Sequence, residues 1–381
     1  MNSFSQGFST SDDGAGFEQA LETIAERILE QQGRRKKVAE ALAGLRKVSF
    51  EPVEGLVEPF IVNEVKMDPL SDLIVAGVDG GLLEQQLHGL DLILVRAIAA
   101  IFHYRDATLD AAEYIPNEVP PPKLIDVSES LDSWEFQLLA GMERQLAEIE
   151  LAAGAAEVSD AKIVILDGSI VPQYVERFPH NPLLLERYQK LIKAYTKLYK
   201  TCVESGAFLV GAVKDSRGGR FVDILKRGIL PVYNDLGFEQ GDLAILDRSR
   251  DTVLLDHLLG VGERTPAFTY AEKPASYVLS DLGAWAAKVH VFYIKTVPFD
   301  RPLRVEFLDN LEKPAETANS VASLVYALSS HHDAFGLPSV IIEADVCARL
   351  AEEDLCIVRD SISDRLGPSS LLDLRRNRRP F

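Results

Sequence analysis

Two aspartates follow apolar, β-rich segments of the chain, and a glycine follows each of them. Asp79 lies near the end of an expected strand over residues 73–81, and Asp167 ends an expected strand over residues 162–166. Functional sites collect at strand ends in α/β sheets, and neighbouring carboxylates repel unless a cation lies between them. The pattern therefore predicts a site for a hard divalent ion, Mg²⁺ or Mn²⁺. The alternative, that each Asp-Gly is an ordinary turn, stays open.

The composition limits the function classes. The chain has 381 residues, of which 47% are hydrophobic, and carries a net charge of −18 from 40 basic and 58 acidic residues. It is too acidic for a simple basic protein that coats nucleic acid, although a metal can supply positive charge locally. Three cysteines without a CxxC pair argue against a zinc knuckle or a redox dithiol, and favour a reducing, cytoplasmic location. We expect no membrane span and no membrane partner.

Other common enzyme signatures do not occur in the sequence. There is no dinucleotide fingerprint GxGxxG, no phosphate loop GxxxxGK[ST], no nucleophile elbow GxSxG and no zinc motif HExxH. Dinucleotide enzymes, P-loop ATPases, α/β-hydrolases and zincin proteases all lose support.

The periodicity predicts an α/β fold with a mixed sheet core flanked by helices. Expected strands cover residues 73–81, 90–103, 162–166, 208–213, 243–247, 287–297 and 302–308, the first two as a hairpin. Expected helices cover 129–152, 182–205, 316–332 and 339–352, and a proline-rich loop covers 112–125.

The same reading divides the chain into four parts. These are a disordered leader (1–15), a helical N-terminal extension and connector (16–70), a main domain (71–365) with an inserted subdomain at about 215–285, and a basic tail (366–381). Within the extension, Gly33 is expected to end one helix, and the basic run 34–37 to begin another.

Several short motifs follow one another in a recognisable order between about residues 70 and 350. They are Val78-Asp79-Gly80-Gly81 leading to 94–97, then 164–170, 210–216, 260–265, and the pair 292–295 and 304–306. This ordered set resembles the NurA-type nuclease family. The resemblance implies an RNase H-like fold and a Mn²⁺- or Mg²⁺-dependent exonuclease, using two ions, that trims DNA ends from 5′ to 3′ in double-strand break repair. It also implies a homodimer that works with a HerA-type hexameric ATPase.

The resemblance assigns roles to particular residues. Asp79 and Asp167 would be the first and second metal ligands. We expect a third carboxylate on the helix before Asp167 and choose Glu143, at the rim of that helix's apolar face. Glu135 and Glu148 remain alternatives.

The same resemblance assigns roles to three further residues. Lys214 would stabilise charge on the phosphate, or else pair with Asp215 or another nearby acid. Tyr293 would face the site, or else be a packed aromatic. Asp345 stands where the family often has a histidine, and it would be an additional metal ligand.

DNA contacts require local basic residues, for which we choose Arg96, Arg217, Arg220 and Lys295. A chain of charge −18 should grip DNA weakly at physiological salt, because affinity rests on phosphate neutralisation, and this favours a partner that delivers the DNA. Two alternatives remain: an inactive scaffold that caps the ATPase, and an ATPase related to sugar or acetate kinases.

Overall fold

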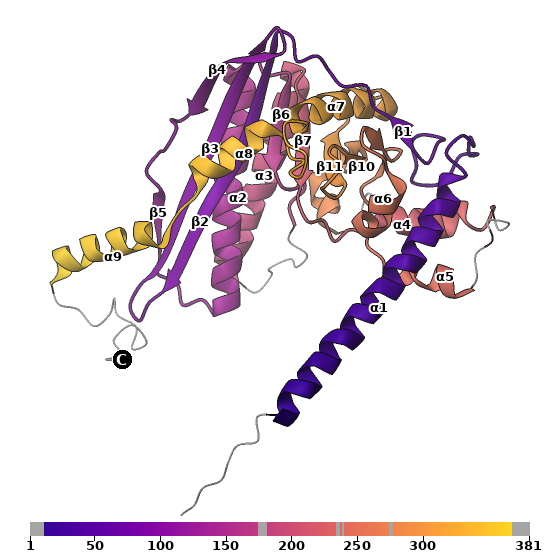
Figure 1. Cartoon of the computed structure of the whole chain (residues 1–381). Helices are drawn as coiled ribbons and strands as arrows, with labels where there is room; N and C mark the ends of the chain where they lie inside the picture. The colour runs from indigo at the N-terminus through magenta and orange to yellow at the C-terminus, as the bar shows by residue number, and fades with distance from the viewer. Residues whose placement is uncertain (1–10, 174–180, 234–236, 238–239, 274–276, 368–381) are drawn as a thin grey trace, which may run out of the picture.

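The computed structural model describes residues 11–173, 181–233, 237, 240–273 and 277–367 (Figure 1). Within these residues the strands join one mixed, 11-stranded sheet in the order β1-β8-β10-β11-β7-β6-β2-β3-β4, with β5 paired to β3 and β9 to β10. The strands are β1 Asn63–Glu64, β2 Leu73–Gln86, β3 Asp91–Arg105, β4 Thr108–Ile115, β5 Lys123–Val127, β6 Ile163–Asp167, β7 Phe208–Val213, β8 Glu263–Arg264, β9 Phe268–Thr269, β10 Val289–Lys295 and β11 Leu303–Leu308.

The centre of the sheet is parallel and both of its sides are antiparallel. β6 runs parallel to β2 and to β7, while β2, β3 and β4 form an antiparallel meander and β11 runs antiparallel to β7. The residues of β6 from Ile163 to Leu166 are buried, as expected for a strand covered on both faces. The predicted mixed sheet flanked by helices is confirmed.

Helices cover both faces of this sheet (Figure 1). One face packs against α2 (Ser133–Val158) and α3 (Pro182–Ser205), and the other against α7 (Pro314–Ser329) and α8 (Ser339–Ala348). Local chemistry fixes the ends of α3, since the Asn181 side chain caps its first turn and Gly206 ends it with φ 74°. The strand predicted over 208–213 and the helix over 182–205 match the structure at both ends.

A long N-terminal helix, α1 (Ser11–Ala43), projects from the body, and only its last part is packed (Figure 1). Val38 and Leu42 join a third apolar core with short helices that follow β7: α4 Arg220–Ile224, α5 Gln240–Ala244 and α6 Asp251–Leu258. A final helix, α9 (Glu352–Leu366), lies by the β2–β3 hairpin tip, where Val358 and Ile362 pack against Leu87. Among the described residues, no helix is both long enough and apolar enough to cross a membrane.

Several sequence-based boundaries are wrong. Gly33 does not end a helix, because α1 continues through it, and α1 begins at Ser11 inside the predicted leader. Residues 243–247 cover the end of α5, a turn and the start of a short 3₁₀ helix rather than a strand. β4 and β5 take up half of the predicted loop 112–125, and α9 was not predicted. Residues 1–10 of the leader and 368–381 of the basic tail lie outside the described residues.

Candidate metal centre

Three aspartates from different parts of the sequence meet at one edge of the sheet. Asp79 lies on β2, Asp167 ends β6, and Asp345 lies on α8; one carboxylate oxygen from each lies within 4.8 Å of the others. The expectation that Asp79 ends its strand is wrong, because β2 continues to Gln86. Parallel pairing with β6 nevertheless stops at Val78 and Leu166, so Asp79 is the first residue of β2 beyond that pairing. The two aspartates therefore lie side by side where β6 ends.

Two glycines allow α8 to lie directly against β2. A Cβ atom on Gly77 would stand 2.7 Å from the carbonyl oxygen of Val340, and one on Gly81 would collide with the last turn of α8. Alternate residues of a strand share a face, so Asp79, between these glycines, also faces α8. The missing side chains thus bring the helix close enough for Asp345 to reach Asp79.

The three carboxylates of the cluster repel one another. Burial and the neighbouring charge of Asp167 raise the pKa of Asp79 to about 7, although the backbone N–H of Gly80 donates to Asp79 Oδ1 at 2.7 Å. Asp345 pairs at 3.3 Å with Arg349, one turn further along α8. A divalent cation would relieve the repulsion among three carboxylates, and oxygen is the ligand that Mg²⁺ and Mn²⁺ prefer.

A fourth acid approaches this cluster from α2. Glu148 is buried beneath Gly80, where a Cβ atom would lie 2.5 Å from Glu148 Oε1. Burial raises the pKa of Glu148 to about 8; the nearby Arg144 opposes that rise, and the charges of Asp79 and Asp167 add to it. Arg144 donates to Glu148 Oε1 at 2.7 Å. Glu148, which the sequence left as an alternative, is therefore the acid of α2 that lies close enough to Asp79 and Asp167 to interact with their charges.

The choice of Glu143 as the third carboxylate is corrected by the structure. Glu143 is buried elsewhere along α2, where it pairs with Arg187 at 3.0 Å and Lys123 at 3.6 Å. Five residues separate it from Glu148, and at about 100° per residue they point about 140° apart. The other alternative, Glu135, caps the start of α2 by accepting from the backbone N–H of Asp132 at 3.2 Å.

Lys214 lies next to the cluster, just beyond the end of β7. Its Nζ donates to Asp167 Oδ2 at 2.5 Å, so it pairs with a nearby acid, but with Asp167 rather than Asp215. Burial lowers the pKa of Lys214, but the hydrogen bond and the charge of Asp167 outweigh burial and raise it. A cation therefore stands beside the three carboxylates.

Tyr293 does not face the cluster, contrary to expectation. The residue is fully buried, and its hydroxyl donates to Asp251 Oδ2 at 3.0 Å and accepts from Arg304 Nη1 at 3.3 Å. The strand register explains why: Tyr293 stands opposite Arg304 and then Val213, whereas Asp167 stands opposite Ala212. Neighbouring residues of β7 point to opposite faces, so Tyr293 lies on the face away from Asp167.

Two of the four residues chosen for DNA contacts are held inside the protein. Arg96 is buried and donates to the carbonyl oxygens of Pro120 at 2.8 Å and Arg349 at 2.7 Å. Lys295 is largely buried and pairs with Asp256 at 2.7 Å. Arg96 therefore joins β3 to the segment between α8 and α9. Contrary to the prediction, neither Arg96 nor Lys295 is available to contact DNA.

The other two lie on the segment that follows β7. Arg220 is half-buried beside Gly55, where a Cβ atom would lie 2.9 Å from Arg220 Nη2. Arg217 is exposed, three residues after Lys214. Of the four residues predicted to contact DNA, Arg217 is thus the best placed to reach a DNA strand at the candidate metal centre.

Comparison with known proteins agrees with this arrangement. The family model described as the NurA domain matches residues 73–350, nearly three-quarters of the chain. The chain belongs to the NurA family. The match contains all three aspartates of the cluster together with Glu148 and Lys214, and it omits all of α1 and all of α9.

Two solved NurA structures have the same fold. The crystal structure of the NurA nuclease from Sulfolobus solfataricus has a TM-score of 0.53 at 14% identity, over 90% of this chain and 97% of that one. A second NurA structure gives 0.50 at 11% identity, over 93% and 99%. A NurA structure with manganese gives 0.45 at 11%, over 92% and 99%. The expected RNase H-like α/β class is confirmed. Comparison with curated proteins gave no significant match.

Proposed function

We propose that this NurA-family chain is a divalent-metal-dependent deoxyribonuclease that hydrolyses phosphodiester bonds at DNA ends. The observation that carries the proposal is the meeting of Asp79, Asp167 and Asp345 within 4.8 Å beside Lys214. Solved relatives are described as a nuclease and as NurA with manganese. A carboxylate cluster with an adjacent lysine is the donor set that phosphoryl chemistry with Mg²⁺ or Mn²⁺ requires.

The residues fit such an ion well. Asp79, Asp167 and Asp345 would hold it, and Glu148 adds a carboxylate on the α2 side, where a second ion would need one. When bound, the metal supplies Lewis acidity toward water and phosphate oxygens. Burial and, after it, the neighbouring charge of Asp167 raise the pKa of Asp79 to about 7, and a cation would relieve the repulsion between the two carboxylates.

The chain's own residues provide the rest of the site. Lys214 is positioned to exchange its bond with Asp167 for one to a phosphate oxygen and so to stabilise charge on the reacting phosphate. Arg217 would hold the strand further along. α8 positions Asp345, and its close packing on β2 keeps the three aspartates in a fixed arrangement.

The biological setting is the finer part of the proposal. We infer a cytoplasmic, homodimeric exonuclease that trims ends from 5′ to 3′ in double-strand break repair, delivered to DNA by a HerA-type hexameric ATPase. The family supports this setting, and so does the net charge of −18, which weakens unaided binding to DNA. The three cysteines, all free, suit a reducing compartment.

An inactive scaffold is the alternative, and it was motivated by Asp345 in place of a histidine. The Asp345 carboxylate lies within 4.8 Å of the other two, where it would add a ligand rather than remove one. This observation favours the active enzyme.

The test is cleavage of labelled single- and double-stranded DNA with Mn²⁺, Mg²⁺ or EDTA, with and without the ATPase. We expect metal-dependent cleavage by the wild type and its loss in Asp79→Ala and Asp167→Ala. Absence of cleavage by the wild type even with the ATPase would favour the scaffold.

A further inference from the structure

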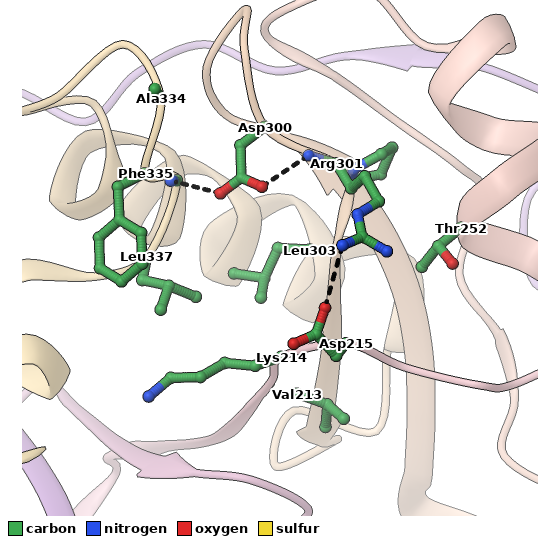
Figure 2. Close-up of a pocket in the computed structure, with 12 residues that line it drawn as sticks. Val213, Lys214, Asp215, Thr252, Asp300, Arg301, Leu303, Ala334, Phe335 and Leu337 are labelled. Carbon is green, nitrogen blue, oxygen red and sulfur yellow. Dashed lines mark hydrogen bonds and ion pairs between the residues drawn. The ribbon is translucent and has the colours of Figure 1, made fainter. Parts of the chain in front are cut away.

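A small pocket lies next to the metal centre on the side of β7 and β11. Its volume is about 170 Å³, and three segments wall it: 213–215 after β7, 300–303 before β11, and 334–337 between α7 and α8. Lys214 lines the pocket (Figure 2). It also links the pocket to the metal centre, because its Nζ donates to Asp167 Oδ2. A DNA strand with one phosphate at the three aspartates of the cluster would therefore place an adjacent nucleoside at this pocket.

One wall of the pocket is apolar and carries an accessible aromatic ring. Phe335 and Leu337 lie together on one side of the pocket, opposite Thr252 (Figure 2). Phe335 is 45% exposed, so a flat ligand can reach its ring. Aromatic rings in such positions hold single-stranded nucleic acid by stacking on its bases, with little sequence preference.

The opposite wall carries a cation on a fixed loop. Arg301 pairs with Asp215 at 3.3 Å, and both side chains are largely exposed, so the guanidinium can exchange this weak partner for a phosphate. Asp300 accepts from the backbone N–H groups of Arg301 at 2.7 Å and Gly336 at 2.8 Å. These bonds tie the loop that carries Arg301 to the loop that carries Phe335 (Figure 2).

We propose that this pocket receives the base of a terminal nucleotide of a single DNA strand, stacked on Phe335, with Arg301 on a neighbouring phosphate. The identity of the strand as substrate rests on the proposed nuclease function. The volume is below the 300–1,000 Å³ of sites for drug-sized ligands and suits one flat ring system. Such a pocket grips a frayed end by one base, which offsets the repulsion of DNA by an acidic protein.

The test uses oligonucleotides that carry 2-aminopurine, a base whose fluorescence falls when it stacks, at the 5′ or the 3′ end. Binding to the full chain is measured with Ca²⁺ replacing Mn²⁺, and a gel checks that the strand stays intact. The matched control is Phe299→Ala, since Phe299 lies on the loop before Asp300, is 78% exposed, and is not among the described residues that line the pocket. Phe335→Tyr keeps a ring for stacking.

We expect quenching at one of the two ends with the wild type, Phe299→Ala and Phe335→Tyr. Phe335→Ala should lose the quenching and bind about fivefold more weakly or worse, since stacking of one base on an aromatic ring is worth at least about that factor. The proposal is overturned if the wild type never quenches, if Phe335→Ala quenches like Phe299→Ala, or if Phe335→Tyr fails as Phe335→Ala does. The nuclease proposal fails separately, through absence of metal-dependent cleavage by a wild type that still quenches.

Discussion

At the scale of single residues, two glutamates on one helix have opposite roles. Glu148 lies at the acidic cluster with its pKa raised to about 8, whereas Glu143 pairs with Arg187 and Lys123. We predict that Glu148→Gln lowers the rate of DNA cleavage about 10- to 100-fold, the usual range for a lost group that supports a metal site. Its melting temperature should hardly change, because the amide replaces a carboxyl that is largely neutral at pH 7.

Glu143→Gln is the matched control for this prediction. It should lower the free energy of unfolding by about 1–3 kcal/mol, since it leaves buried Glu143's cationic partners without a charged acceptor. Its cleavage rate per folded molecule should stay within about twofold of the wild type. The reverse pattern, measured by thermal unfolding and single-turnover cleavage, would restore Glu143 as the third carboxylate.

Arg96 gives a second prediction at this scale. Because it is buried and bonds to two carbonyl oxygens, Arg96→Ala should destabilise the fold by about 1–3 kcal/mol without weakening DNA binding. Arg217 lies on the exposed segment after β7, so Arg217→Ala should weaken DNA binding and leave the stability of the fold unchanged. Urea unfolding and fluorescence anisotropy on labelled DNA separate the two, and a loss of DNA affinity confined to Arg96→Ala would contradict this assignment.

The sequence allowed us to predict which residue types form the site better than which way their side chains point. Asp79, Asp167 and Asp345 were expected as ligands, and the structure brings them together. Orientation around a helix was the weak point, because several acids of α2 border its apolar face and only packing against Gly80 distinguishes Glu148. The prediction for Tyr293 was wrong for a similar reason, since the face on which it lies depends on the register of four strands, which the sequence does not show.

At the scale of elements, the glycines of β2 decide how closely α8 approaches. Gly77→Ala would place Cβ 2.7 Å from the Val340 carbonyl oxygen, so we expect a loss of about 1–3 kcal/mol in unfolding free energy and weaker Mn²⁺ uptake as α8 shifts. Gly154→Ala in α2 meets nothing within 4 Å and should stabilise by about 0.5–1 kcal/mol. Calorimetry on both variants is the check; equal melting temperatures would show that α8 is not tightly packed.

Regular elements were predicted well where local signals agreed. α3 has an N-cap, a proline in its first turn and a terminal glycine, and its predicted limits match. The prediction that Gly33 ends a helix was wrong because a glycine inside a helix costs only about 1 kcal/mol, which the long α1 tolerates. Asp79 misled because the glycines after it, which indicate a turn, instead allow α8 and Glu148 to pack against a continuing strand.

At the scale of the whole molecule, the net charge of −18 opposes binding to DNA. Cleavage by the isolated protein at low DNA concentration should therefore fall steeply between about 50 and 200 mM salt, as phosphate contacts are screened. At the upper salt concentration, the hexameric ATPase with ATP should raise the rate about tenfold or more. Equal rates for the isolated protein and the complex at both salt concentrations would contradict the role of a delivering partner.

The most direct test of the metal centre is the uptake of Mn²⁺, followed by electron paramagnetic resonance and independent of any cleavage. The comparison needs the wild type, Asp79→Asn, Asp167→Asn and Asp345→Asn, with Glu143→Gln as the control that keeps the cluster intact. Saturable uptake by the wild type and the control, weakened at least tenfold in each aspartate variant, is the predicted result. Equal uptake by all five proteins, or none by the wild type, would contradict the assignment of Asp79, Asp167 and Asp345 as metal ligands.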